Sequence, residues 1–74
     1  MANITKGAVA LRSWRLSAEL TQTAASKLIG IGKSVYWEYE AGTKRPRIPS
    51  AVRIHAATGI AVEAWGDEVE PVAA

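Results

Sequence analysis

An all-α fold of five short helices is the architecture that this 74-residue sequence predicts. Three glycines, Gly30, Gly42 and Gly59, each follow a segment in which apolar residues recur at helical spacing. Glycine just beyond a helix end readily takes the left-handed conformation that stops the helix. No long stretch alternates apolar and polar residues as a half-buried strand would. We expect one helical domain over residues 1–66 and a short, acidic, disordered tail over residues 67–74.

The bounds of the helices follow from their end signals. Thr21 is placed to cap the second helix, where its hydroxyl can accept a hydrogen bond from an unpaired amide. Pro49 stands where the fourth helix begins, and proline is tolerated in a first turn. The expected helices are Lys6–Ser17, Gln22–Ile29, Lys33–Ala41, Pro49–Thr58 and Ala61–Gly66.

A thin hydrophobic core follows from the same periodicity. A domain of this size buries only about 60–65% of the surface that its unfolded chain exposes, and several inward positions carry alanine. Stability is therefore expected to be marginal unless the packing is efficient or two copies associate. The expected core residues are Ala8, Leu11, Trp14, Leu20, Ala25, Leu28, Ile29, Ile31, Val35, Tyr36, Tyr39, Ile48, Ala51, Val52, Ile54, Ile60, Val62 and Trp65.

Composition argues against several classes of protein. The chain has no cysteine and one histidine, so neither a disulfide framework nor a metal site is expected. The helical body lacks paired carboxylates and any nucleophile set, so no enzyme is expected, and no cofactor or small-molecule ligand is implied. There is no apolar run of roughly 18 residues and no resemblance to a signal peptide. We expect a cytoplasmic protein.

The distribution of charge suits a polyanionic partner. All nine basic residues lie between Lys6 and Arg53, against three acidic residues in that segment, which gives it a net charge of +6. The other four acidic residues lie near the end of the chain. Lysine and arginine neutralise phosphates and release their counterions. Composition alone leaves open the alternative of an ordinary solvated surface.

The second and third expected helices, joined by a glycine turn and followed by a basic loop, have the layout of a helix-turn-helix. The start of a helix carries positive partial charge and free N–H groups, so Thr21 and Gln22 are expected to hold a DNA phosphate. A role as helix cap, without any phosphate contact, also explains Thr21. The loop residues Lys44, Arg45 and Arg47 are expected to contact phosphates as well.

Four side chains of the third helix are expected to turn outward and read bases: Lys33, Ser34, Trp37 and Glu38. Lys33 can donate to guanine or to a phosphate, and Glu38 can accept from the amino group of cytosine. Trp37 can contact thymine methyl groups or sugars. Partial burial against the second helix, or a protein–protein contact, explains Trp37 equally well.

Two charged residues have a structural interpretation. Arg15 and Glu40 each lie among apolar neighbours on their expected helices. An ion pair between them would satisfy both charges, and removal of one partner of such a pair is costly.

From Leu11 to Trp65 the sequence resembles the Cro and phage-repressor family, also called XRE-type helix-turn-helix proteins. The resemblance implies a compact, five-helix, λ-repressor-like domain that binds operator DNA as a homodimer, formed in solution or only on DNA. By position, Gln22, Lys33, Ser34 and Glu38 match the DNA-contact sites of the family, and Arg15 with Glu40 matches its ion pair. The residues that carry the resemblance are Thr21, Gln22, Gly30, Glu40, Gly42, Pro46, Gly59 and Ile60.

The resemblance also places the dimer interface at Ile60, Val62 and Trp65. Departures from the family pattern occur at Ala25, at Gly32 and at Thr58. The predicted function is a sequence-specific regulator of transcription, a short Cro-like repressor that inserts its third helix into the major groove. The alternative is a protein-interaction module, antitoxin-like or an adaptor, of the same fold.

Overall fold

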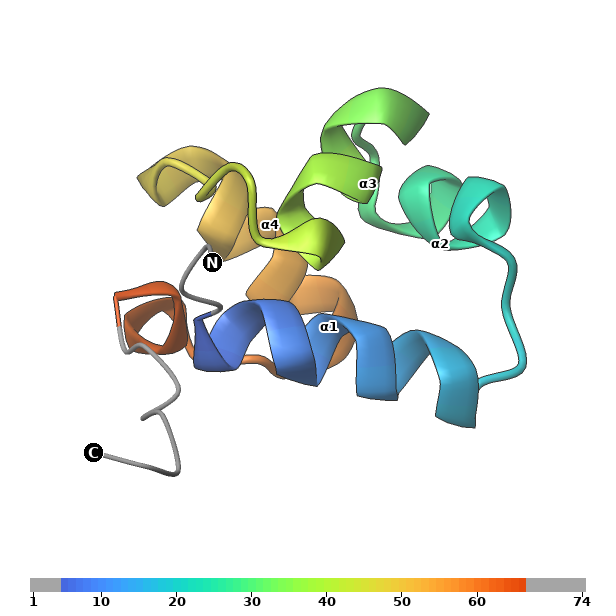
Figure 1. Ribbon diagram of the computed structural model, residues 1–74, viewed down its shortest axis with the longest axis horizontal. Helices are drawn as coiled ribbons and strands as arrows, with labels where there is room; N and C mark the ends of the chain where they lie inside the picture. Colours follow the sequence, from blue (N-terminus) through green and yellow to red (C-terminus); the bar gives the residue numbers. More distant parts are fainter. Residues whose placement is uncertain (1–4, 67–74) are drawn as a thin grey trace.

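Four α-helices and one short 3-10 helix make up residues 5–66, the part of the chain that the computed structural model describes (Figure 1). The bounds predicted for the first three helices are confirmed. The prediction for the tail falls on residues 67–74, outside the described residues. In chain order the elements are α1 (Lys6–Ser17), α2 (Gln22–Ile29), α3 (Lys33–Ala41), α4 (Ile48–Thr58) and η1 (Val62–Trp65).

The end signals act as expected. The hydroxyl of Thr21 caps α2 by accepting a hydrogen bond from the amide of Ala24 at 3.1 Å. Gly30, Gly42 and Gly59 end α2, α3 and α4 with φ angles of 88°, 82° and 80°, in the left-handed region that favours glycine.

Two predictions about the second half of the chain are corrected. The helix α4 begins at Ile48, one residue earlier than predicted, so the proline stands second in the first turn, where no helical hydrogen bond is lost. The fifth element is a four-residue 3-10 helix rather than an α-helix over Ala61–Gly66. Its hydrogen bonds join residues three apart, from the Ala64 amide to the Ala61 oxygen and from the Gly66 amide to the Glu63 oxygen. A segment this short closes the tighter turn.

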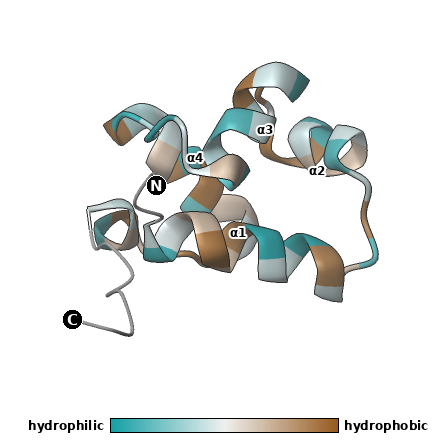
Figure 2. Cartoon of the chain, viewed as in Figure 1, coloured by the Kyte–Doolittle hydropathy of each residue, from teal (hydrophilic) through white to brown (hydrophobic). Residues whose placement is uncertain are grey.

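The core lies where the helices cross. The helix α1 packs against α3 and η1, α2 packs against α3 and α4, and α4 packs against η1. Each helix carries both apolar and polar stretches, as expected for helices with one buried face (Figure 2). The buried apolar residues are Ala8, Leu11, Ala25, Ile29, Tyr36, Tyr39, Ala51, Ile54, Ile60 and Trp65.

Three residues expected in the core are exposed instead. Leu28 is 63% exposed, Ile48 68% and Val52 51%. The reason is that α2 and α4 pack through other faces. Because successive residues turn by about 100° around a helix, Leu28 lies roughly a quarter-turn from the buried face of α2. Ile48 and Val52 lie at least that far from the buried face of α4, which Ala51 and Ile54 form.

The helix α1 approaches η1 as closely as a glycine allows. A Cβ atom added at Gly7 would lie 2.4 Å from Cδ2 of Trp65, well inside van der Waals contact. The indole of Trp65 also packs on the ring of Tyr39, with ring centroids 6.1 Å apart. Trp65 therefore holds α1, α3 and η1 together.

Gly7→Ala is expected to lower the free energy of unfolding by about 1–3 kcal/mol, because the added methyl group must displace the buried indole. Urea denaturation followed by circular dichroism measures the change. The matched control is Gly66→Ala, whose added Cβ would meet nothing nearer than the Glu63 backbone oxygen at 3.5 Å. That variant should stay within about 0.5 kcal/mol of the parent. Equal stability of the two variants would contradict the tight packing at Gly7.

Candidate nucleic-acid interface

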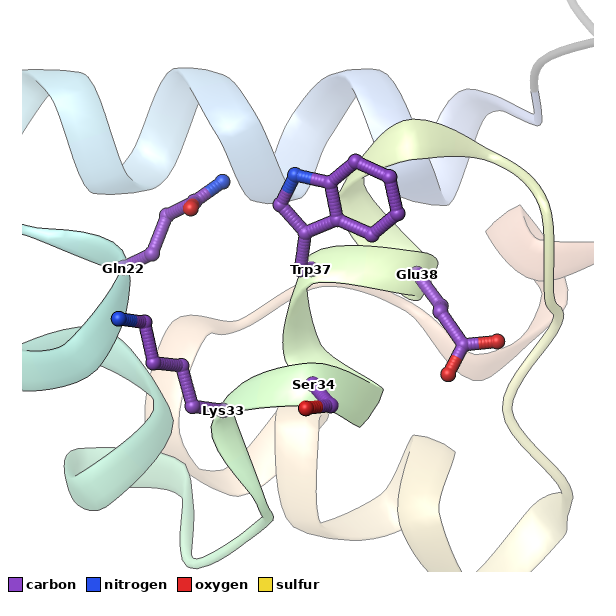
Figure 3. A pocket seen from close by; sticks show the side chains of 5 residues that line it. All are labelled: Gln22, Lys33, Ser34, Trp37 and Glu38. Carbon is purple, nitrogen blue, oxygen red and sulfur yellow. The ribbon is translucent and has the colours of Figure 1, made fainter.

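An open hollow of about 490 Å³ lies where the start of α2 meets α3, lined by five side chains. Four of them are the residues predicted to read bases, Lys33, Ser34, Trp37 and Glu38, and the fifth is Gln22 (Figure 3). The structure therefore brings together residues from both helices of the helix-turn-helix.

The orientation of α3 is set by its buried face. Tyr36 and Tyr39 are buried in the core, so the opposite face of the helix turns outward. Lys33, Ser34 and Trp37 are exposed on that face and Glu38 is half-buried. Lys33 and Trp37 are four residues apart, so they lie one turn above the other on the same side of the helix.

The remaining predicted phosphate contacts flank α3. Thr21 and Gln22 lie at the start of α2, where the first amide groups have no partner within the helix. The basic loop with Lys44, Arg45 and Arg47 leaves the other end of α3 (Figure 1). All three of these basic side chains are exposed.

The carboxylate of Glu40 accepts hydrogen bonds from three other helix residues, among them Gln22 of the hollow. Arg15 donates twice, from Nε to Oε2 at 2.8 Å and from Nη2 to Oε1 at 2.9 Å, which makes a bidentate ion pair between α1 and α3. The Tyr36 hydroxyl donates to Oε2 at 2.7 Å, and Gln22 Nε2 donates to Oε1 at 3.3 Å. Arg15 also donates from Nη1 to the carbonyl oxygen of Leu20 at 3.1 Å.

Sequence reasoning paired Arg15 with Glu40 but missed the other two donors. Tyr36 and Glu40 are four residues apart on α3, which was a usable signal for their contact. The contact of Gln22 had no such signal, because the two residues are 18 positions apart and meet only when α2 packs on α3.

The network shifts the pKa of its members. Burial by itself would raise the pKa of Glu40, but the hydrogen bonds from Arg15, Tyr36 and Gln22 outweigh it and lower that pKa below the ordinary value. Burial and the hydrogen bond to Glu40 raise the pKa of the Tyr36 hydroxyl. The hydrogen bond to Glu40 likewise raises the pKa of Arg15. The carboxylate and guanidinium thus stay charged.

The residues predicted for the dimer interface lie in η1 and in the segment just before it. Ile60 is 8% exposed and Trp65 4%, so packing within the chain takes up most of their surface. Val62 is half-buried and lines an open groove with Pro46, Ile48 and Ala51. Of the three predicted residues, Val62 presents the most side chain to a partner.

Residues 5–66 contain neither a helix that could cross a membrane nor a cluster that could hold a metal ion. The helices there are all too short or too polar to cross a membrane. Histidine, aspartate and glutamate side chains do not gather there in groups of three that could hold a metal ion.

The stability of the chain is expected to fall in acid because of Glu40. A group whose pKa is lowered by folding stabilises the fold above its ordinary pKa, here 4.5, and loses that contribution as pH falls through the folded value. Below pH 4.5 the Glu40→Gln variant should therefore lose stability less steeply than the parent. At pH 7 it should be less stable by about 3 kcal/mol, since Arg15 is left without its counter-charge.

Urea denaturation at a series of pH values measures both effects. Glu63→Gln is the matched control, because Glu63 is exposed on η1. It should leave the acid dependence nearly unchanged. Parallel curves for the parent and Glu40→Gln would contradict the role of the network.

Comparison with known proteins agrees with this geometry. Residues 11–65 match the helix-turn-helix family HTH_3. No curated protein matches the sequence. The crystal structure of an HTH_3 family transcriptional regulator from Vibrio cholerae is similar in fold, with a TM-score of 0.69 and 24% sequence identity. The match covers 82% of this chain and 34% of that one, so this chain spans about a third of the length of that regulator. Because the family match extends over more than half of the sequence, the chain belongs to the HTH_3 helix-turn-helix family.

Proposed function

We propose that this protein is a sequence-specific, double-stranded-DNA-binding regulator of transcription, a Cro-like repressor that inserts α3 into the major groove of its operator. The observation that carries the proposal is the hollow in which the outward side chains of α3 meet Gln22 of α2. Membership of a helix-turn-helix family supports it. The similar structure from Vibrio cholerae, a transcriptional regulator, agrees with it.

The base-reading roles follow from the chemistry of the groove. Lys33, exposed at the first position of α3, donates to guanine O6 or N7, and Ser34 beside it donates or accepts. Glu38 accepts from the N4 amino group of a cytosine. Trp37 supplies the apolar surface among these polar groups.

Phosphate contacts fix the register of α3 on the duplex. The start of α2, with Thr21 and Gln22, holds one phosphate, and the hydrogen bond to Glu40 orients the Gln22 amide toward it. Lys44, Arg45 and Arg47 hold the strand at the other end of α3. Both ends of the recognition helix are thereby anchored.

Two copies bind together, with their recognition helices about 34 Å apart, one turn of DNA. The self-association surface is the groove that Val62 lines with Ile48, extended along α4 by Val52. Ile60 and Trp65, which are buried in the single chain, support this surface by their packing in the core. The exposed apolar side chains of α4 favour this surface, because they fill no place in the core of the single chain.

A protein-interaction module of the same fold is the second candidate. The exposure of Trp37, at 52%, favours it, since a large exposed aromatic is common at protein interfaces. Trp14 is half-buried against the core and offers less surface to a protein partner.

A salt titration separates the two candidates. Sites are selected from a random double-stranded DNA library, and the affinity of the full chain for the selected DNA is measured by fluorescence anisotropy at several salt concentrations. We expect the logarithm of the association constant to fall linearly with the logarithm of salt, with a slope of about −0.9 per neutralised phosphate. If no DNA is selected, or affinity does not depend on salt, the interaction module is favoured.

Base-reading and phosphate-binding residues should respond differently to truncation. Lys33→Ala or Glu38→Ala should reduce discrimination at one base pair by about 1–3 kcal/mol, because each removes one base-specific contact. Lys44→Ala should weaken binding to all sequences alike and reduce the salt slope by about 1. Competition binding against single-base variants of the selected site measures both. If Glu38→Ala left the base preference unchanged, the proposed contact of Glu38 with a base would be wrong.

A further inference from the structure

Trp37 is the one large apolar side chain in the hollow, and folding leaves it about half exposed, at 52%. Every other residue that lines the hollow is polar or charged. Exposed apolar surface in the middle of a recognition helix stabilises nothing in the free protein, yet it gains free energy when a partner covers it. The partner that Trp37 meets depends on what surrounds its ring.

The surroundings of the ring differ on its two sides. Figure 3 shows the indole nitrogen on the side of Gln22 and the six-membered ring on the side of Glu38. On the Gln22 side, the indole N–H, the Lys33 ammonium and the start of α2 form a donor-rich region suited to phosphate. On the other side, the six-membered ring lies toward Glu38, whose carboxylate repels phosphates. A base edge fits that side better than the sugar-phosphate backbone does.

The major groove offers few apolar groups to such a ring. The C5-methyl group of thymine is the distinctive one, and apolar side chains read thymine through it. The same methyl group occurs in 5-methylcytosine, which also keeps the N4 amino group that a carboxylate accepts from. Trp37 therefore suits a pyrimidine that carries a C5-methyl group, and Glu38 adds a contact where that pyrimidine is 5-methylcytosine.

We propose that Trp37 determines specificity by packing its six-membered ring on the C5-methyl group of one pyrimidine in each half-site. This inference rests on the proposed function, because it requires α3 to lie in the major groove. It makes the protein sensitive to a single methyl group on the DNA, whether that methyl belongs to thymine or to 5-methylcytosine.

The test uses the full chain and DNA sites selected from a random library. In one series each thymine is replaced singly by deoxyuridine, which lacks only the methyl group. In a second series each cytosine is replaced singly by 5-methylcytosine. At one position per half-site we expect either about a fourfold loss of affinity on replacement by deoxyuridine or about a fourfold gain with 5-methylcytosine. These factors correspond to one buried methyl group.

The variants locate the effect. At the sensitive position, Trp37→Ala should bind DNA with and without the methyl group equally tightly. Trp37→Phe should keep part of the difference in affinity, because its ring still covers the methyl group. Leu28→Ala is the matched control, since Leu28 is 63% exposed on α2 and lies with Arg53 and Ala57 rather than in the hollow. It should keep the full difference. Circular dichroism of each variant establishes that it is folded.

The outcomes are distinct. Sensitivity to deoxyuridine assigns the methyl group to thymine, and sensitivity to 5-methylcytosine assigns it to a methylated cytosine. The proposal is overturned if no position is sensitive to the methyl group, or if Trp37→Ala keeps the sensitivity. It is also overturned if that variant weakens binding to every site equally, which would place the ring against the backbone. Absence of any salt-dependent DNA binding would instead refute the proposed function.

Discussion

The carboxylate of Glu40 is the group on which the arrangement of the helices depends. It lies on α3, pairs with Arg15 of α1 and accepts from Gln22 of α2, so it joins three helices that pack around a thin core. Burial of a charge is costly unless the charge is paired and hydrogen-bonded. Here the donors from Arg15, Tyr36 and Gln22 offset that cost, and the bond from Gln22 links α2 to α3.

The placement of α2 relative to α3 is also the geometry of the candidate interface. Gln22 donates to Glu40 and also lines the hollow, so the network ties the start of α2 to α3. Tyr36 has two roles, because its ring is buried in the core while its hydroxyl holds the carboxylate. A change at Arg15, Tyr36 or Glu40 would therefore reach the candidate interface without altering any residue that lines it.

Local signals explain which parts of the fold were predictable. Capping by Thr21 and the stops at Gly30 and Gly42 act within one helix end, so the bounds of α2 and α3 follow from sequence. Outward placement of Lys33 and Trp37 follows from helical period. The exposure of Leu28 and Ile48 depends instead on which face of each helix meets a neighbour, and periodicity in a helix of eight to eleven residues defines that face poorly. The link from Gln22 to Glu40 is a tertiary contact and has no sequence pattern.

Trp65, which was expected at a dimer interface, is buried by packing within the single chain. Its indole rests on Gly7 of α1 and beside Tyr39 of α3, and this contact seats η1 against the helical body. With η1 seated, Val62 comes to line the same groove as Ile48 of α4. A larger residue at Gly7 would shift η1 and thereby divide this apolar surface. The intramolecular packing of Trp65 thus positions the apolar groove of Val62 and Ile48, the surface proposed for self-association.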